Sequence, residues 1–475
     1  MARRLPVFDA MRGQPVEIRI ADTAVRAFAN ESIAAAALAS GTRVMSRSLK
    51  YHRPRTFFCL EGHCSGCLVR LDGVPNLRAC QSPCTPGAEA HGQNAFPSAE
   101  VDLLGAVDFL FSRGLDHHTL MTGSSVLNKL ANKVVRQLSG LGKLPATQAT
   151  SLPAVGNREI DVCVIGGGPA GLAAATACAK AGKKVVLIDD QLQAGGSLRA
   201  DPTTGRAVAN ERVAEAVNAG VELFERSTAI GYFPEDDPDP AWLHGAVLAT
   251  TQKSGSTTRP ATSADEDAST VISTEHLARG VLAVATPEQL VRVHAKAYIW
   301  ATGGYPVNLP FADNDRPGVI AARAVGRLLV DHGILGGEKI CIVEVPQLAA
   351  ETEVLSAALT AAGAEVWRVA LDDTHGTRGR SWVSQVQTSH GRIDCDLVAV
   401  AAIPSPASEG PRQQGCKVVL DPDAGGFRVV VDDTGKTSAP YVFACGDVTG
   451  YIGPARAAAH GALVGASALA AIGGA

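Results

Sequence analysis

Five of the eleven cysteines lie close together near the start of the chain, with a spacing that can bind an iron–sulfur cluster. Cys59, Cys64 and Cys67 form the C-x4-C-x2-C pattern of plant-type [2Fe–2S] loops, which need a distant fourth thiolate. Cys80 supplies it after a predicted hairpin, and Cys84 is either a spare thiol or a substitute for Cys80. Four thiolates also suit zinc. The pattern therefore predicts a [2Fe–2S] cluster, with zinc as the alternative.

A second group of residues has the spacing of a dinucleotide site. Gly166, Gly168 and Gly171 follow a short apolar run in the order G-x-G-x-x-G, and a helix is expected from there on. The glycines permit a tight turn, close approach of a pyrophosphate, and packing of the helix on the strand. Asp189 ends the next apolar run and is placed to accept ribose hydroxyls. An ordinary glycine-rich βα turn is the alternative.

Further cofactor contacts are expected where later strands end and helices begin. Asp447 stands after an apolar strand and before a Gly/Ala-rich helix, where an acid could hold the ribityl hydroxyls of a flavin. No catalytic acid, base or nucleophile can be named from the sequence. The remaining expected contacts are Pro169, Ala170, Asp190, Gly195, Gly196, Ser197, Ala229, Ala301, Thr302, Gly303 and Gly446.

A second nucleotide-binding unit is expected downstream, as a strand over 339–343, a helix over 348–362 and a strand over 365–369. Its turn, 344–350, has side chains and Pro346 where glycines should stand. Side chains there would keep the backbone away from a pyrophosphate. The sequence therefore predicts that the fold persists without ordinary NAD(P)H binding.

The other segments give weaker signals. The basic stretch 43–55 is either a solvated face or a docking surface. Helices are expected over 101–111 and 125–141, with His117 and His118 between them left unassigned, and an exposed excursion over 233–275. Residues 220–230 are expected to form one more parallel strand.

Bulk properties exclude several classes of protein. The 475 residues carry a net charge of −4, which argues against nucleic acid as the main partner. No apolar segment follows the basic N-terminus, so we expect a cytoplasmic location and no secretion. The Gly/Ala-rich stretch 455–475 is better explained by a packed helix than by a membrane span.

The order of the motifs resembles a known family. Gly166–Gly171, Ala301–Gly304 and Cys445–Asp447 resemble the two-dinucleotide flavoproteins that include glutathione and thioredoxin reductases. Ser46–Arg55, Asp189–Leu198 and Ala312–Val319 resemble the α subunits of heterotetrameric sarcosine oxidase and of dye-linked proline, hydroxyproline and opine dehydrogenases.

This resemblance implies an α/β fold. An N-terminal [2Fe–2S] ferredoxin-like α+β domain would precede a glutathione-reductase-like FAD domain with an inserted second Rossmann-like domain. The expected divisions are the ferredoxin-like domain (1–99), a helical connector and linker (100–157), the FAD domain (158–336 and 434–475) and a degenerate nucleotide-binding insert (337–433).

The resemblance also implies a function. The chain would carry FAD and [2Fe–2S] as an electron-transfer subunit of an amine oxidase or dehydrogenase, and a flavoprotein β subunit would oxidise the amine. Further small subunits, an FMN shared with a partner subunit, and ATP or another nucleotide in the insert are compatible with it.

This sequence departs from the family in two ways. It ends at Ala475, whereas the sarcosine oxidase α subunit continues, and it carries cluster ligands that several relatives place on a separate small subunit. It therefore resembles a fusion. The alternatives are an NAD(P)H-dependent reductase feeding an oxygenase and a non-catalytic scaffold.

Overall fold

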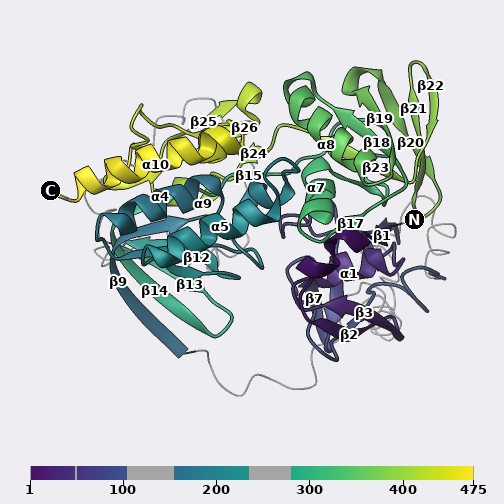
Figure 1. Cartoon of the computed structure of the whole chain (residues 1–475), viewed down its shortest axis with the longest axis horizontal. Helices are drawn as coiled ribbons and strands as arrows, with labels where there is room; N and C mark the ends of the chain where they lie inside the picture. The colour runs from purple at the N-terminus through teal and green to yellow at the C-terminus, as the bar shows by residue number, and fades with distance from the viewer. Residues whose placement is uncertain (1, 49–50, 104–153, 235–279, 474–475) are drawn as a thin grey trace, which may run out of the picture.

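The computed structural model describes residues 2–48, 51–103, 154–234 and 280–473. The helices expected over 101–111 and 125–141, His117, His118 and the excursion over 233–275 lie almost entirely outside these residues. The described chain forms an N-terminal domain, a large α/β domain and a second α/β domain (Figure 1).

The N-terminal domain is a five-stranded sheet covered by one helix, α1 (Ile33–Ala39). Ser32 caps α1 by accepting a hydrogen bond from Ala35 N at 3.2 Å. Alanines dominate α1, and their small side chains let the helix pack closely on both sides. The strand order is β3-β2-β8-β6-β7, with bounds β2 (Pro15–Ile20), β3 (Thr23–Phe28), β6 (Leu68–Leu71), β7 (Val74–Arg78) and β8 (Glu89–His91).

The large domain is built on a mainly parallel sheet. Its inner strands are continuous apolar runs because both faces are covered; all four residues of β10 are buried. The order is β11-β10-β9-β14-β13-β12, and β27 also pairs with β14. The strands are β9 (Ala154–Ile165), β10 (Val185–Ile188), β11 (Glu222–Phe224), β12 (Thr228–Pro234), β13 (Gly280–Ala285), β14 (Gln289–Trp300) and β27 (Val442–Ala444).

The expectation of a single parallel strand over 220–230 is wrong. The structure has β11, parallel to β10, and then β12, which is antiparallel to β13. Arg226 lies between them with a φ of +54°, a backbone turn that an apolar pattern does not indicate.

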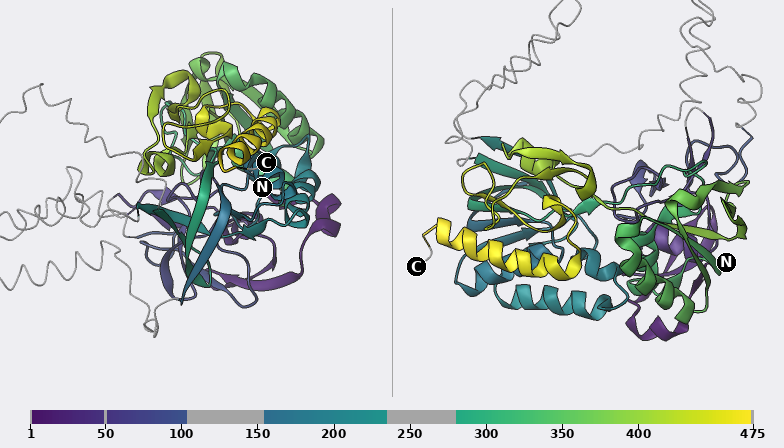
Figure 2. Two further views of the ribbon diagram at one scale, coloured as in Figure 1. Left: turned by 90° about the vertical axis from the view of Figure 1, so that its left-hand side faces the viewer. Right: turned by 90° about the horizontal axis from the view of Figure 1, so that it is seen from above.

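Helices α4 (Pro169–Lys180), α5 (Gly205–Asn218) and α10 (Pro454–Ala471) lie on one face of this sheet (Figure 2). Helix α10 corresponds to the helix expected at the end of the chain. It packs on α4 so closely that a Cβ at Gly461 would lie 2.0 Å from the carbonyl oxygen of Ala170. No described helix combines the length and the apolar character needed to cross a membrane.

The second α/β domain has a four-stranded parallel sheet in the order β16-β23-β18-β19. The expected strand, helix and strand over 339–369 are present as β18, α8 and β19. An antiparallel meander of β20, β21 and β22 follows. The bounds are β16 (Val319–Ala321), α7 (Ala322–Val330), β18 (Lys339–Glu344), α8 (Ala349–Ala361), β19 (Glu365–Ala370), β20 (Thr374–Gly379), β21 (Val383–Thr388), β22 (Gly391–Asp394) and β23 (Leu397–Ala401).

The sheets divide the chain at other points than the expected boundaries at 337 and 433. Strand β16 already belongs to the second sheet. The chain returns to the large domain at β24 (Ser405–Pro406), which pairs with β15 (Gly304–Tyr305). Helix α9 (Glu409–Gln413) and the hairpin of β25 (Val418–Asp421) and β26 (Gly426–Val429) follow there. Strand β9 also begins at Ala154, before the boundary expected at 158.

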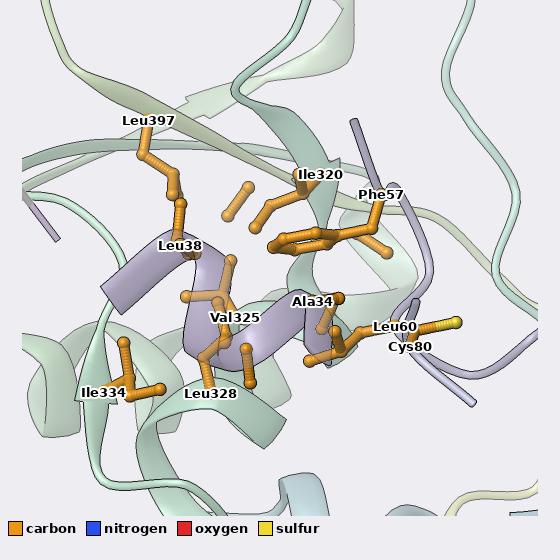
Figure 3. Close-up of a cluster of buried hydrophobic side chains, with 14 of the residues drawn as sticks. Ala34, Leu38, Phe57, Leu60, Cys80, Ile320, Val325, Leu328, Ile334 and Leu397 are labelled. Carbon is orange, nitrogen blue, oxygen red and sulfur yellow. The ribbon is translucent and has the colours of Figure 1, made fainter. Parts of the chain in front are cut away.

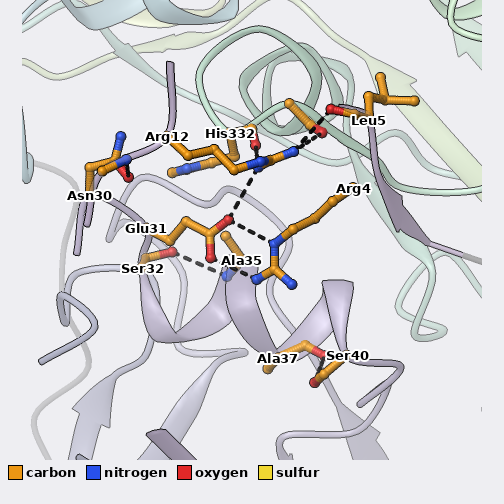
Figure 4. Close-up of polar contacts among 12 residues, drawn as sticks. Arg4, Leu5, Arg12, Asn30, Glu31, Ser32, Ala35, Ala37, Ser40 and His332 are labelled. Atoms are coloured by element: carbon orange, nitrogen blue, oxygen red, sulfur yellow. Dashed lines mark hydrogen bonds and ion pairs between the residues drawn. The ribbon is translucent and has the colours of Figure 1, made fainter. Parts of the chain in front are cut away.

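The N-terminal domain packs on the second α/β domain through an apolar core (Figure 3). Ala34 and Leu38 of α1 face Val325 and Leu328 of α7. A buried polar network lies beside this core, where Glu31 accepts hydrogen bonds from Arg4 Nε at 3.1 Å and Nη2 at 2.7 Å (Figure 4). The short strand β1 (Arg3–Arg4) also pairs with β17 (Ile334–Leu335). The cysteine-bearing domain is thus fixed against the rest of the chain.

Candidate cofactor sites

The glycine-rich turn joins β9 to α4, and its three glycines serve different purposes. Gly166 has a φ of +107°, and a Cβ there would lie 2.3 Å from Ala301 O. A Cβ at Gly171 would lie 1.8 Å from Gly166 O. At Gly168, the nearest atom to a Cβ would be Gly196 Cα, 4.0 Å away. The first and third glycines are therefore required by the fold, whereas the second faces open space that a ligand could fill.

This turn borders a cavity of about 460 Å³. Fourteen of the sixteen cofactor-binding residues expected from the sequence line it, namely Gly166, Gly168, Pro169, Ala170, Asp189, Asp190, Gly196, Ser197, Ala229, Ala301, Thr302, Gly303, Gly446 and Asp447. Gly171 and Gly195 lie outside the lining. Gly195 N donates a hydrogen bond to Gly167 O at 2.8 Å and so stabilises the glycine-rich turn that borders the cavity.

The two acids after β10 have different surroundings. Asp189 is buried, and its carboxylate accepts hydrogen bonds from Gly167 N at 2.6 Å and Gln191 N at 2.9 Å. Burial, together with the nearby charge of Asp190, raises the pKa of Asp189 to about 7. Asp190 is exposed at the cavity. Asp189 thus holds the glycine turn in place, and both acids line the cavity in which the ribose hydroxyls are expected.

Several cavity residues come from segments that the glycine motif does not indicate. Glu61 and His63 belong to the cysteine loop, and Arg323 and Arg327 lie on α7. The arginines are four residues apart and therefore share one face of the helix, which is the one signal in the sequence that could have revealed them. Nothing in the spacing of the cysteines shows that their loop meets the dinucleotide site.

A second cavity of about 510 Å³ adjoins the first, with Ser197, Arg323 and Asp447 lining both. It runs along the first turn of α10, beside Tyr451. Asp447 Oδ1 accepts hydrogen bonds from Ile452 N at 3.0 Å and Gly453 N at 3.2 Å. The carboxylate thus fixes the entry into α10 at the junction of the cavities. The second cavity is also lined by Leu348, Glu351 and Leu355 of the second α/β domain.

The cysteine loop gathers sulfur atoms and backbone N–H groups. Cys59 Sγ lies 3.5 Å from Cys64 Sγ and accepts hydrogen bonds from Glu61 N at 3.4 Å and Cys64 N at 3.3 Å. Hydrogen bonds from the Cys64 and Cys80 thiols hold the pKa of Cys59 well below its usual range. Gly66 is required by the fold, since a Cβ there would lie 2.1 Å from Thr56 O. Such a loop suits an anionic cluster, whose sulfurs accept hydrogen bonds.

Cys80 fits better than Cys84 as the fourth ligand. The Cys80 thiol interacts with Cys59 and Cys67, whereas Cys84 lies near Glu31, to whose carbonyl its N–H donates at 3.0 Å. Burial raises the pKa of the Cys84 thiol to about 12, so it stays a thiol.

The sulfur atoms of the four expected ligands lie near one another. The Cys59 thiol interacts with those of Cys64 and Cys80, and the Cys67 thiol interacts with that of Cys80. No three His, Cys, Asp or Glu side chains in the described ranges are placed to hold a single metal ion. A chain of four thiolates can instead hold two irons in pairs.

The degenerate turn of the second α/β domain is occupied by an ion pair. Arg368 on β19 donates to Glu344, where β18 ends, with Nη2 3.0 Å from Oε1 and Nε 3.2 Å from Oε2. The same guanidinium donates to Ala349 O at 2.9 Å, and Thr352 also donates to Glu344. The turn thus carries paired side chains where a pyrophosphate site needs glycines, in agreement with the prediction that NAD(P)H does not bind there.

The basic stretch 43–55 forms a small hairpin of β4 (Ser46–Arg47) and β5 (Pro54–Arg55). Arg47 donates to Ala99 O at 2.7 Å and to Glu100 O at 3.1 Å. Arg43 stacks on Trp382. Contacts within the chain thus account for much of this charge, which favours a structural role over a docking surface.

Three segments match known families. Residues 13–95 match a 2Fe-2S iron-sulfur cluster binding domain, residues 161–259 match an FAD dependent oxidoreductase, and residues 352–462 match a pyridine nucleotide-disulphide oxidoreductase. The third match begins after the degenerate turn. The predicted cofactors, FAD and [2Fe–2S], and the predicted class of flavoprotein oxidoreductase are confirmed by these matches.

Two curated relatives extend the match along the chain. Sarcosine oxidase subunit alpha of Rhizobium meliloti (strain 1021) is 29% identical over 444 residues, 90% of this chain and 40% of its own. The same subunit of Corynebacterium sp. (strain P-1) is 25% identical, over 99% of this chain and 45% of its own. The chain is similar to sarcosine oxidase alpha subunits. The predicted resemblance is therefore confirmed, and the chain spans less than half the length of these relatives.

A solved structure supports the fold. L-proline dehydrogenase from P. horikoshii superposes with a TM-score of 0.68, at 18% identity, over 97% of this chain and 74% of that chain. At this identity the likeness concerns the fold alone. The superposition shows that the two chains share one fold over nearly the whole length of this chain.

Proposed function

We propose that this chain is the electron-transfer subunit of a multi-subunit amine oxidase or dehydrogenase. A partner flavoprotein subunit would oxidise the CH–NH group of a secondary amine of the sarcosine, proline or opine type and deliver the electrons to this chain. The similarity to sarcosine oxidase alpha subunits supports the class of reaction.

The observation that carries this proposal is the position of the cysteine loop. Glu61 and His63 lie between the expected ligands Cys59 and Cys64 and also line the dinucleotide cavity. The two expected cofactors would therefore lie on either side of one short segment of chain. FAD accepts electrons in pairs and releases them singly, whereas a [2Fe–2S] cluster carries one, and this difference explains why one chain would hold both.

The electron balance is simple. Oxidation of a secondary amine to an imine releases two electrons and two protons; the protons would leave at the partner, and the electrons would enter this chain. A one-electron acceptor, such as a dye, would take them from the cluster one at a time. Cys59, Cys67 and Cys80 are buried and Cys64 is half-buried, so the edge of the cluster nearest to solvent would lie at Cys64.

The alternative, an NAD(P)H-dependent reductase, has less support. It would need a nucleotide beside the turn at 344–350, where Arg368 and Glu344 form their ion pair. No contact among the described residues indicates binding of a shared FMN or of ATP, so the proposed function includes neither.

The test uses the complex of this chain with its partner subunit. Amine-dependent reduction of a one-electron dye is measured for the wild-type complex and for Cys64→Ser, whose iron content is determined. We expect the variant to lose most of the dye reduction while amine still bleaches the flavin absorbance. Unchanged dye reduction in an iron-free variant would show that the cluster is not on the path.

A further inference from the structure

The side-chain amide of Gln191 joins three parts of the molecule. Its Nε2 donates to Glu61 O in the cysteine loop at 2.9 Å and to Asp190 Oδ1 at 2.7 Å. Its Oε1 accepts from Arg327 Nη1 at 2.9 Å and from Gln81 Nε2 at 3.3 Å. Both donors and both acceptor positions of the amide are thus used, and the residue is 9% exposed. Four hydrogen bonds fix the orientation of this buried amide, and the same bonds position its four partners.

Both sides of this contact belong to cofactor sites. Gln81 follows the expected ligand Cys80 and packs over the cysteine loop, where a Cβ at Gly62 would lie 2.7 Å from Gln81 Nε2. On the other side, Asp190 and Arg327 line the dinucleotide cavity. Gln191 therefore contacts the cluster loop and the dinucleotide cavity through one side chain.

Arg327 forms no direct ion pair with any residue that the structure describes. It is 5% exposed and lines the cavity, yet its guanidinium donates to neutral acceptors, Gln191 Oε1 and Gly196 O, the latter at 3.4 Å. Its Nε has no hydrogen-bond partner within the described ranges. The nearby Asp331 is paired with Arg199 at 3.0 Å. A buried guanidinium that donates only to neutral acceptors and keeps one N–H unpaired is costly, so this arrangement indicates a place for an anionic ligand.

We propose that Arg327 binds the pyrophosphate of the dinucleotide, and that Gln191 is a positioning residue that links this contact to the cluster loop. Gly196, which accepts from Arg327, lies beside Gly168, where the glycine turn leaves open space. The proposal rests on the proposed function for the identity of the two cofactors. Its consequence is energetic coupling: cluster and dinucleotide each strengthen the binding of the other, by the same factor.

The experiment measures the dissociation constant of FAD for the full chain by quenching of flavin fluorescence, with the cluster present and in the iron-free Cys64→Ser background. The ratio of the two constants is the coupling. For the wild type we expect cluster loss to weaken FAD binding by at least about fivefold. Gln191→Met keeps the size of the side chain but none of its amide bonds, and should bring the ratio close to one.

Matched variants complete the test. Gln193→Met makes the same substitution two residues later and should keep the wild-type ratio. Gln81→Met acts on the cluster side, outside the cavity, and should lower the ratio even if Gln191→Met proves unstable. Arg327→Met should weaken FAD binding roughly ten- to a hundredfold, whereas Arg158→Met, which removes a surface cation, should not.

The outcomes separate this proposal from the proposed function. A wild-type chain that binds no FAD or no iron would overturn the proposed function and the coupling with it. A chain that binds both, with the same ratio in the wild type, Gln191→Met and Gln81→Met, would overturn the coupling alone.

Discussion

The ring of His63 lies against the ring of Tyr305, with 4.5 Å between their centroids. His63 precedes the expected ligand Cys64, and Tyr305 follows the turn at the end of β14 that borders the dinucleotide cavity. The Tyr305 hydroxyl donates to Glu409 Oε2 at 3.0 Å, and burial raises the pKa of the phenol. The expected cluster and flavin sites are thus in contact through these two rings and do not belong to independent domains.

Cys64→Ser should remove the iron and the reddish-brown colour while leaving FAD bound at saturating concentration. Cys64 supplies one sulfur of the group and is not among the residues that line the cavity. Iron analysis and the visible spectrum check this, with Cys84→Ser as the control that should keep its iron. One zinc per wild-type chain in place of iron would contradict the assignment of the cluster.

Gly168→Val and Gly171→Val should fail in different ways. A Cβ at Gly168 would lie 4.0 Å from the nearest atom, Gly196 Cα, so this variant should fold yet lose FAD. A Cβ at Gly171 would lie 1.8 Å from Gly166 O, so that variant should not fold stably. Bound flavin and the unfolding midpoint are measured for both. Full flavin content in Gly168→Val would mean that the fingerprint is misassigned.

Asp447→Ala should weaken FAD binding less than Gly168→Val does. The carboxylate is one charged hydrogen-bonding group, worth about 1.5–3 kcal/mol, and it also orders the backbone of Ile452 and Gly453. Titration with FAD measures the loss, and Asp447→Asn, which keeps an acceptor oxygen, should recover part of it. An unchanged dissociation constant in Asp447→Ala would place the ribityl chain elsewhere.

Asp189 should make the stability of the protein depend on pH. Its pKa is raised from the ordinary 3.8 to about 7, so the native state keeps this proton where the unfolded chain has lost it. The contribution of Asp189 to the stability of the folded state is fully present below pH 3.8 and is lost as the pH rises toward about 7. The unfolding midpoint of the wild type minus that of Asp189→Asn should therefore decrease as the pH is raised from about 4 to about 7. A difference independent of pH would contradict this.

Local patterns predicted much of the fold and of the dinucleotide site. Strand β10 coincides with the apolar run that Asp189 ends, because a strand buried on both faces appears in the sequence as a continuous apolar run. The glycine turn was readable because close packing at Gly166 and Gly171 tolerates no side chain.

The remaining features depend on tertiary contacts between distant segments. The break at Arg226, the place of β16 in the second sheet and the pairing of β24 with β15 are set by neighbours far along the chain. The contact between the cysteine loop and the dinucleotide cavity also depends on segments that lie far apart in the sequence.

The most direct measurement is stopped-flow mixing under anaerobic conditions, with the flavin and cluster absorbance followed together. NADH mixed with the isolated chain should leave the flavin oxidised, because the turn beside the Arg368–Glu344 ion pair lacks the glycines that a dinucleotide site needs. Amine should bleach the flavin and reduce the cluster when the partner subunit is present. When the chain is alone, amine should change neither the flavin absorbance nor the cluster absorbance. Rapid bleaching of the flavin by NADH in the isolated chain would contradict the account and favour an NAD(P)H-dependent reductase.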